Sequence, residues 1–103
     1  MSAKEEDSLR VLHVLMQPTR LKIVRLLMDS HRPLYAAEIA TKIGADIRTV
    51  AFHLATLAES GLVEEEYAEI EKAKHSAVGM RQAKFFRVTP KAKETINRLS
   101  ESS

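Results

Sequence analysis

The sequence predicts a mainly α-helical fold with one small β-hairpin, an α+β arrangement with the element order α-α-α-α-β-β-α. Two observations predict it. Apolar residues recur at helical spacing as far as residue 60, and after Gly61 two short segments suit strands instead. The 103 residues suffice for one small domain but not for two, so we expect residues 1–103 to fold as a single domain.

The first helix is expected over residues 3–16, because Ser2 and Glu5 have the spacing of a capping box. A helix that is apolar on most sides is buried on more than one side. The apolar residues here exceed one stripe: Leu9, Val11, Leu12, Val14, Leu15 and Met16. In a chain this short, we expect the second buried surface to belong to another subunit.

A second helix over residues 19–29 follows Pro18, which ends the first helix and suits the first turn of the next. Residues 30–33 form a loop, and Leu34-Tyr35 forms either a short strand or the approach to a third helix. We expect that third helix over residues 36–44. The sequence does not explain its start, because its first residue, an alanine, is a poor cap.

The segment after this start has the layout of a helix, a tight turn and a second helix. Gly44 and Ala45 make the turn, and Asp46 is placed to cap a helix over residues 46–60. Gly61 suits the left-handed position after its last turn. The inward face carries Val50, Leu54 and Leu57. The opposite face is expected to hold Arg48, Thr49, Phe52, His53 and Thr56. This layout predicts a helix-turn-helix, whose second helix can enter the major groove of DNA.

Residues 62–70 and 83–88 both suit strands, and the segment between them is polar and basic. Two such strands form a hairpin, which we call the wing and place at residues 62–88. Helices followed by a basic hairpin of this kind make a winged helix. Thr89 and Pro90 then supply the N-cap and the first turn of a last helix over residues 90–100.

The net charge is only +2, but the charges are unevenly placed. Residues 61–71 contain five Glu and no Lys or Arg, whereas residues 72–93 contain seven Lys or Arg and no Asp or Glu. A basic block indicates an anionic partner, although a solvated surface would give the same count. Because carboxylates repel DNA, we expect the acidic strand from Glu64 to Glu71 to face either solvent or a basic surface of the partner subunit.

The composition excludes several kinds of site. The chain has no cysteine, which rules out disulfides, thiolate metal sites and cysteine nucleophiles. Its three glycines provide no phosphate-cradling loop, and no nucleophile elbow or HExxH pattern is present. His13, His31 and His75 have no ligand spacing. We therefore expect no enzyme activity, no catalytic residue, no metal site and no cofactor.

The N-terminus is charged and no apolar run approaches the length of a membrane span. We therefore expect neither a signal peptide nor a membrane partner, and a cytoplasmic location.

Three segments together resemble the ArsR-type winged-helix repressors: QPTRLKIVRLL, EIATKIGADIRTVAFHLATLAESGLV and GMRQAKFFRVTPKA. The matching features are Pro18-Thr19-Arg20 at the start of the second helix, His53-Leu54 within the helix over 46–60, and Gly61-Leu62-Val63 at the exit into the wing. The resemblance covers about residues 8–99. It implies a homodimeric DNA-binding transcription regulator, usually a repressor, that dimerises through its terminal helices.

Within those helices, 3–16 and 90–100, we expect a dimer interface formed by Leu9, Leu12, Met16, Ile96 and Leu99. Many members of the family sense metals through cysteines at the start of the third helix, or through histidines and carboxylates on the last. Here Tyr35 to Ile39 contains no cysteine, and the last helix has no histidine. The resemblance is therefore to a variant that does not sense metals. An effector, if there is one, would need the dimer interface.

We call the helix over residues 46–60 the recognition helix. Its expected DNA contacts are Ile47, Arg48, Thr49, Phe52, His53 and Thr56, joined by Lys72, Lys74, Arg81 and Lys84 of the wing. Arg48 and Thr49 lie in the first turn, where side chains reach base edges. Phe52 either packs under the wing or touches a base methyl. His53 lies near the core boundary, where a structural, hydrogen-bonded histidine is the favoured role and a titrating switch is the alternative. Arg20 is interpreted as structural.

The recognition helix carries apolar residues where relatives often carry polar ones. Sequence specificity would then depend on Arg48, Thr49, thymine methyl groups or DNA shape. The sequence thus predicts a sequence-specific regulator, a repressor that binds double-stranded DNA at a palindromic operator as a homodimer. Two alternatives stay open: a protein–protein interaction module, which Phe52 and the acidic strand fit better, and a sequence-indifferent, chromatin-like DNA-binding protein.

Overall fold

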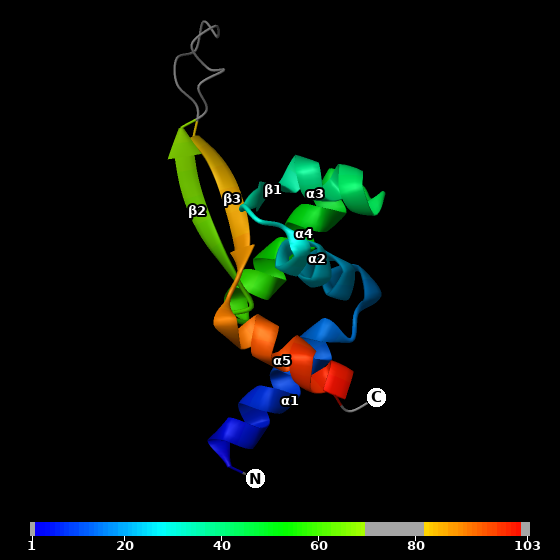
Figure 1. Cartoon of the computed structure of the whole chain (residues 1–103), viewed down its shortest axis with the longest axis vertical. Helices are drawn as coiled ribbons and strands as arrows, with labels where there is room; N and C mark the ends of the chain where they lie inside the picture. Colours follow the sequence, from blue (N-terminus) through cyan, green and yellow to red (C-terminus); the bar gives the residue numbers. More distant parts are fainter. Residues whose placement is uncertain (1, 70–81, 102–103) are drawn as a thin grey trace, which may run out of the picture.

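The structure, a computed structural model, describes residues 2–69 and 82–101 (Figure 1). Its elements follow in the order α1 (Ala3–Leu15), α2 (Pro18–Asp29), β1 (Leu34–Tyr35), α3 (Ala36–Ile43), α4 (Ile47–Glu59), β2 (Val63–Glu69), β3 (Gln82–Val88) and α5 (Pro90–Glu101). The predicted class is confirmed: the chain is mainly helical, with a small antiparallel sheet. The predicted order lacked one element, the two-residue strand β1.

The sheet has the strand order β1-β3-β2. The hairpin of β2 and β3 is the predicted wing, and its register places Val63 opposite Val88. On the other edge of β3, Leu34 lies opposite Phe86, so Leu34-Tyr35 is a strand and not merely the approach to α3. Because side chains alternate along a strand, this register puts Leu34, Phe86 and Val63 on the face that α4 covers.

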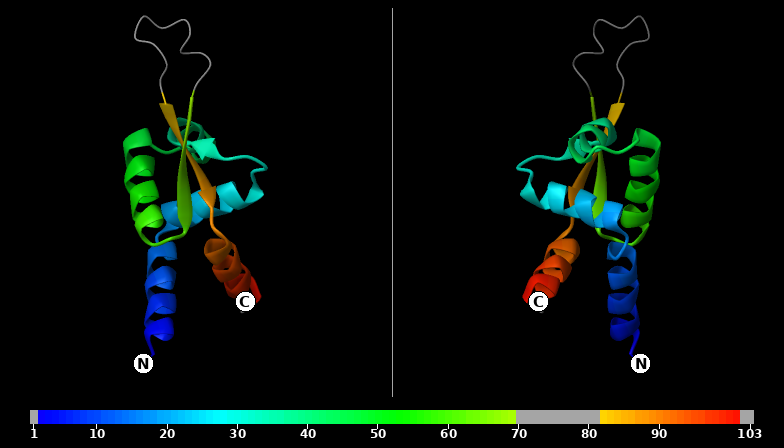
Figure 2. Two further views of the ribbon diagram at one scale, coloured as in Figure 1. Left: turned by 90° about the vertical axis from the view of Figure 1, so that its left-hand side faces the viewer. Right: turned by 90° about the vertical axis from the view of Figure 1, so that its right-hand side faces the viewer.

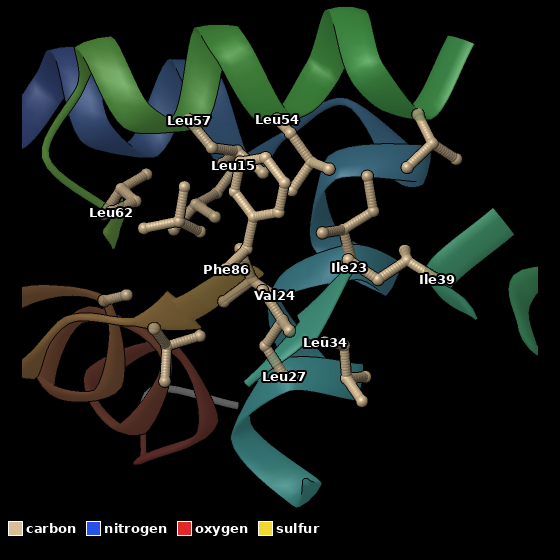
Figure 3. Close-up of a cluster of buried hydrophobic side chains, with 14 of the residues drawn as sticks. Leu15, Ile23, Val24, Leu27, Leu34, Ile39, Leu54, Leu57, Leu62 and Phe86 are labelled. Carbon is tan, nitrogen blue, oxygen red and sulfur yellow. The ribbon is translucent and has the colours of Figure 1, made fainter. Parts of the chain in front are cut away.

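The hydrophobic core lies between that face of the sheet and helices α2 and α4. Figure 3 shows the side chains of α2 and α4 pointing toward Phe86 of β3 and Leu34 of β1. Among the most deeply buried side chains are Ile23, Val24, Leu54, Leu57 and Leu62. The inward face predicted for the recognition helix is therefore confirmed, and α4 is held firmly against the sheet.

The terminal helices α1 and α5 extend from one end of the body and diverge from each other (Figure 2). An open groove of about 510 Å³ runs between them, and Lys91 of α5 bridges it with an ion pair to Asp7 of α1 at 3.1 Å. Leu9, Met16 and Leu99 are exposed, as a partner-facing surface requires, and Leu12 lines the groove. Ile96 corrects the prediction: it is only 5% exposed and belongs to the core of its own subunit.

The start of α3, which the sequence left unexplained, depends on an acidic residue in its first turn. The Glu38 carboxylate accepts a hydrogen bond from the backbone N–H of Tyr35 at 3.2 Å. Arg32, in the preceding loop, forms an ion pair with the same carboxylate, and this pairing lowers the pKa of Glu38. The helix is thus capped from its third residue rather than from its first.

Candidate nucleic-acid interface

The turn between α3 and α4 forms as the sequence predicts. Gly44 has a φ of 70°, in the left-handed region that only glycine adopts freely. Oδ1 of Asp46 accepts a hydrogen bond from the backbone N–H of Arg48 at 2.7 Å, which caps α4. One backbone N–H that has no partner within the helix is thereby satisfied, and the first turn of α4 is held in place.

The end of α4 has an equally specific cap. Gly61 has a φ of 74°, and its N–H donates to the carbonyl of Ala58 at 3.0 Å. The N–H of Leu62 donates to the carbonyl of Leu57 at 2.9 Å, and the Leu62 side chain is fully buried. This pair of bonds is a Schellman motif, and it directs the chain from α4 straight into β2.

The outer face of α4 carries most of the predicted contact residues. Ile47 is 49% exposed and Phe52 is 61% exposed, and Arg48 and Thr49 are also exposed. The exposure of Phe52 contradicts packing under the wing, because a ring in that position would be covered, and its contact with a base methyl stays a prediction. Thr56 is half-buried, and its hydroxyl donates to the carbonyl of Phe52 at 3.3 Å.

His53 is not on that outer face, which corrects its prediction as a DNA contact and confirms the structural, hydrogen-bonded role. It is 7% exposed, and its Nδ1 accepts a hydrogen bond from Nε of Arg20 at 3.1 Å. Arg20 also donates from Nη1 to the carbonyl of Val14 at 3.3 Å. Burial, and secondly the neighbouring charge of Arg20, lower the pKa of His53. The histidine is a structural residue that joins α4 to α2 and, through Arg20, to α1.

Two glutamates of the acidic strand pair with cations of the facing strand. Glu65 lies 3.7 Å from Lys84, and Glu66 lies 2.5 Å from Arg87. Glu64 and Glu65 are exposed, as the predicted solvent-facing placement requires, but the sequence did not predict these cross-strand pairs. Lys84 also lies over the ring of Tyr67, 5.7 Å from its centroid. The other predicted wing contacts, Lys72, Lys74 and Arg81, lie outside the described residues.

A groove of about 390 Å³ separates the wing from α4. Its helix side is formed by Ile47, Ala51 and Ala55, and its wing side includes Glu65 and Lys84. The groove is therefore apolar along the helix and charged along the hairpin. Its two walls are the two elements that a winged helix presents to a duplex, the helix to the groove and the wing to the flanking strand.

The described residues offer neither a metal site nor a membrane-spanning helix. Over the residues that the structure describes, no three histidine, aspartate or glutamate side chains come together in a way that could hold a metal ion. In the same part of the chain, none of the helices has the length and apolar content to cross a membrane.

Comparisons with known proteins agree with this geometry. The family model described as a helix-turn-helix domain matches residues 15–66. No curated protein sequence gives a significant match. The crystal structure of the transcriptional regulator PA3341 is similar, with a TM-score of 0.66 and 24% identity over 95% of this chain. The match spans 65% of that protein's length.

A second similar structure is the homodimeric winged helix-turn-helix DNA-binding domain of Mb0332 from Mycobacterium bovis, a possible ArsR-family transcriptional regulator. It has a TM-score of 0.68 and 20% identity, over 99% of this chain and 87% of that one. These two likenesses establish the fold. Because the helix-turn-helix model covers just over half of the sequence, this chain belongs to the helix-turn-helix domain family.

Proposed function

We propose that this chain is a DNA-binding transcriptional regulator that binds duplex DNA with the outer face of α4. The observation that carries the proposal is the exposure of Arg48 and Thr49 in the capped first turn of α4, within a chain of the helix-turn-helix family. The first turn of such a helix is where side chains reach base edges and backbone N–H groups meet a phosphate.

The groove between α4 and the wing is the natural course for one strand of the duplex. With α4 in the major groove, the adjacent sugar-phosphate backbone would pass between helix and hairpin. Lys84 lines this groove, and its ion pair with Glu65 is long, at 3.7 Å. A phosphate can therefore replace Glu65 as the partner of Lys84. The acidic strand then tunes the charge of the wing and does not prevent binding.

We also propose that the protein acts as a homodimer through α1 and α5. Leu9 is 52% exposed, Met16 is 77% exposed and Leu99 is 40% exposed, beside the groove between the two helices. Burying such side chains against a second copy is favourable by about 25 cal/mol for each Å². A two-fold dimer places its recognition helices about 34 Å apart, which implies a palindromic operator. The similar Mycobacterium bovis domain is a homodimer.

Repression by occlusion of a promoter is the simplest mode of action for such a dimer, and it acts in the cytoplasm. The kinship with ArsR-type regulators, in a form that does not sense metals, is part of the same proposal. It is supported by the absence of cysteine from the sequence and by the similarity to a possible ArsR-family protein.

The decisive experiment is selection of bound duplexes from a random pool with the purified protein, followed by titration of the selected site. We expect a palindromic site, and Arg48→Ala should weaken binding at least tenfold. Lys84→Gln should lower the salt slope of binding by about 1, because one phosphate contact is lost. Lys93→Gln on α5, which removes one exposed cation outside the groove, is the matched control. No binding to any duplex at low salt would refute the proposal.

The dimer is tested separately by light scattering. Met16→Glu places a charge on an exposed apolar site, so it should produce a monomer without disturbing the core. A wild-type monomer at micromolar concentration would contradict the proposed dimer.

A protein–protein interaction module is the second candidate function, and the exposed ring of Phe52 favours it. It predicts no selection of a duplex and no salt-dependent binding, so the same experiment decides between the two.

A further inference from the structure

The outer face of α4 offers few groups that could hydrogen-bond to base edges. Its exposed polar residues in the first turn are Arg48 and Thr49. Farther along, the hydroxyl of Thr56 is already occupied by the carbonyl of Phe52, at 3.3 Å. His53 is buried and bonded to Arg20. The middle of the helix therefore has little hydrogen-bonding capacity toward bases, because the Thr56 oxygen can only accept and His53 is buried.

The same stretch of helix exposes apolar side chains instead. Phe52 is 61% exposed, and Ala51 and Ala55 are exposed beside it. The Phe52 ring lies 5.4 Å from the ring of His53, centroid to centroid, at an angle of 57°. Because His53 is itself fixed by Arg20, it supports the Phe52 ring from the protein side. Phe52 is thus an exposed apolar side chain on α4, and the small side chains of Ala51 and Ala55 lie next to it.

We infer that the DNA site of this protein presents thymine methyl groups to Phe52. This inference rests on the proposed function and specifies what the recognition helix reads. In the major groove, the apolar group that distinguishes one base pair from another is the C5-methyl of thymine. An exposed ring has no hydrogen-bonding group, so Phe52 can discriminate between bases only through that methyl.

The spacing of Arg48 and Phe52 along α4 predicts how far apart their two base contacts lie on the DNA. Residues 48 and 52 are four apart, which is about 6 Å along a helix axis. Successive bases are about 3.4 Å apart along each strand of a duplex. The thymine that meets Phe52 therefore lies about two base pairs from the base pair that Arg48 contacts. Arginine most often reads guanine among the bases, so each half-site should contain a guanine about two steps away from one or more thymines.

The test uses the duplex selected from the random pool. Each thymine is replaced in turn by deoxyuridine, which removes the methyl and leaves base pairing unchanged. At one or two positions in each half-site, we expect binding of the wild type to weaken about fourfold, the effect of one methyl-sized group losing its apolar contact. Phe52→Ala should bind the thymine and deoxyuridine duplexes equally. Because Phe52 is exposed, that variant should fold, and its circular dichroism spectrum checks this.

Phe52→Leu is the matched variant, since it keeps an apolar side chain and should keep part of the methyl discrimination. Wild-type binding that is unchanged by every deoxyuridine substitution would overturn the inference, as would discrimination that persists in Phe52→Ala. Either result leaves DNA binding intact and is thus distinguishable from failure of the proposed function, in which the wild type binds no duplex at all.

Discussion

Thr89 connects the end of the recognition helix to the start of the last helix, and its replacement gives a sharp test of this junction. The residue is 8% exposed. Its hydroxyl donates to the carbonyl of Gly61 at 2.8 Å and accepts from the buried N–H of Ala92 at 3.2 Å. Thr89→Val keeps the shape of the side chain and removes both bonds.

The expected loss follows from these two bonds. Removing the N-cap of α5 costs about 1 kcal/mol. Leaving the Gly61 carbonyl without this donor costs about another 1 kcal/mol. A total of about 2 kcal/mol should lower Tm by roughly 8–16 °C in a domain of this size. Thermal unfolding followed by circular dichroism measures the shift, at fixed protein concentration because a dimer's Tm depends on it.

Two controls isolate the role of the hydroxyl. Thr89→Ser retains it and should lose well under half as much stability. Thr95→Val removes a hydroxyl that donates to the carbonyl of Lys91 within the same helix, at 2.9 Å, and that serves no cap, so its effect should be small. If Thr89→Val unfolds at the same temperature as Thr89→Ser, the cap contributes nothing and the reasoning is wrong.

Three further predictions concern the recognition helix and its turn. Burial and the charge of Arg20 lower the pKa of His53, so the unfolded chain binds more protons than the folded one. The stability contributed by neutral His53 is thus complete above about pH 6.5 and is lost as pH falls through the lowered folded-state pKa. Urea titrations should show that the free energy of unfolding falls less on acidification in His53→Gln than in the wild type, because the glutamine amide oxygen can still accept from Arg20 but does not titrate. Equal losses in the two proteins would contradict this. Gly44→Ala should cost about 1–2 kcal/mol through backbone strain alone, because no atom lies within 4 Å of the added carbon. Gly44→Asn should cost less in the same urea assay. Asp46→Ala should lower the free energy of unfolding by about 1 kcal/mol. Asp46→Asn should lower it much less, because asparagine can still cap the backbone N–H of Arg48. Equal losses in the two variants would mean that the cap is unimportant.

The helix-turn-helix unit could be predicted from the sequence because its signals are local. Asp46 caps the helix that follows it, and Gly44 and Gly61 occupy left-handed positions that few other residues tolerate. The periodicity of Val50, Leu54 and Leu57 identified the buried face. Each signal acts within a few residues, so one sequence suffices to find it.

The errors share a different cause, which is a partner distant in the sequence. His53 lies at the edge of the apolar stripe, and its burial depends on Arg20, 33 residues earlier. Ile96 was assigned to a dimer because nothing local distinguishes an apolar residue that meets its own core from one that meets a second copy. The start of α3 had a signal that could have been found, since Glu38 has the position of a capping-box carboxylate.

The acidic strand shows why strand register has to be known before charge can be interpreted. In sequence, the Glu block and the basic block are separate runs that suggest two surfaces. In the hairpin they are interleaved, and Lys84 and Arg87 reach Glu65 and Glu66 across the strands. A cation of the wing that pairs with a carboxylate of the facing strand has to exchange that partner for a phosphate before it contributes to DNA binding.

Two polar bridges connect the terminal helices to the recognition helix. Arg20 joins the carbonyl of Val14 in α1 to His53 in the middle of α4. Thr89 joins Gly61, at the end of α4, to the first turn of α5. Because both bridges are directional and at least partly buried, α4 is fixed relative to both helices that we propose for the dimer interface. In such a dimer, the distance between the two recognition helices would be set by these bridges as much as by the apolar contacts, which explains why polar groups are retained in so small a core.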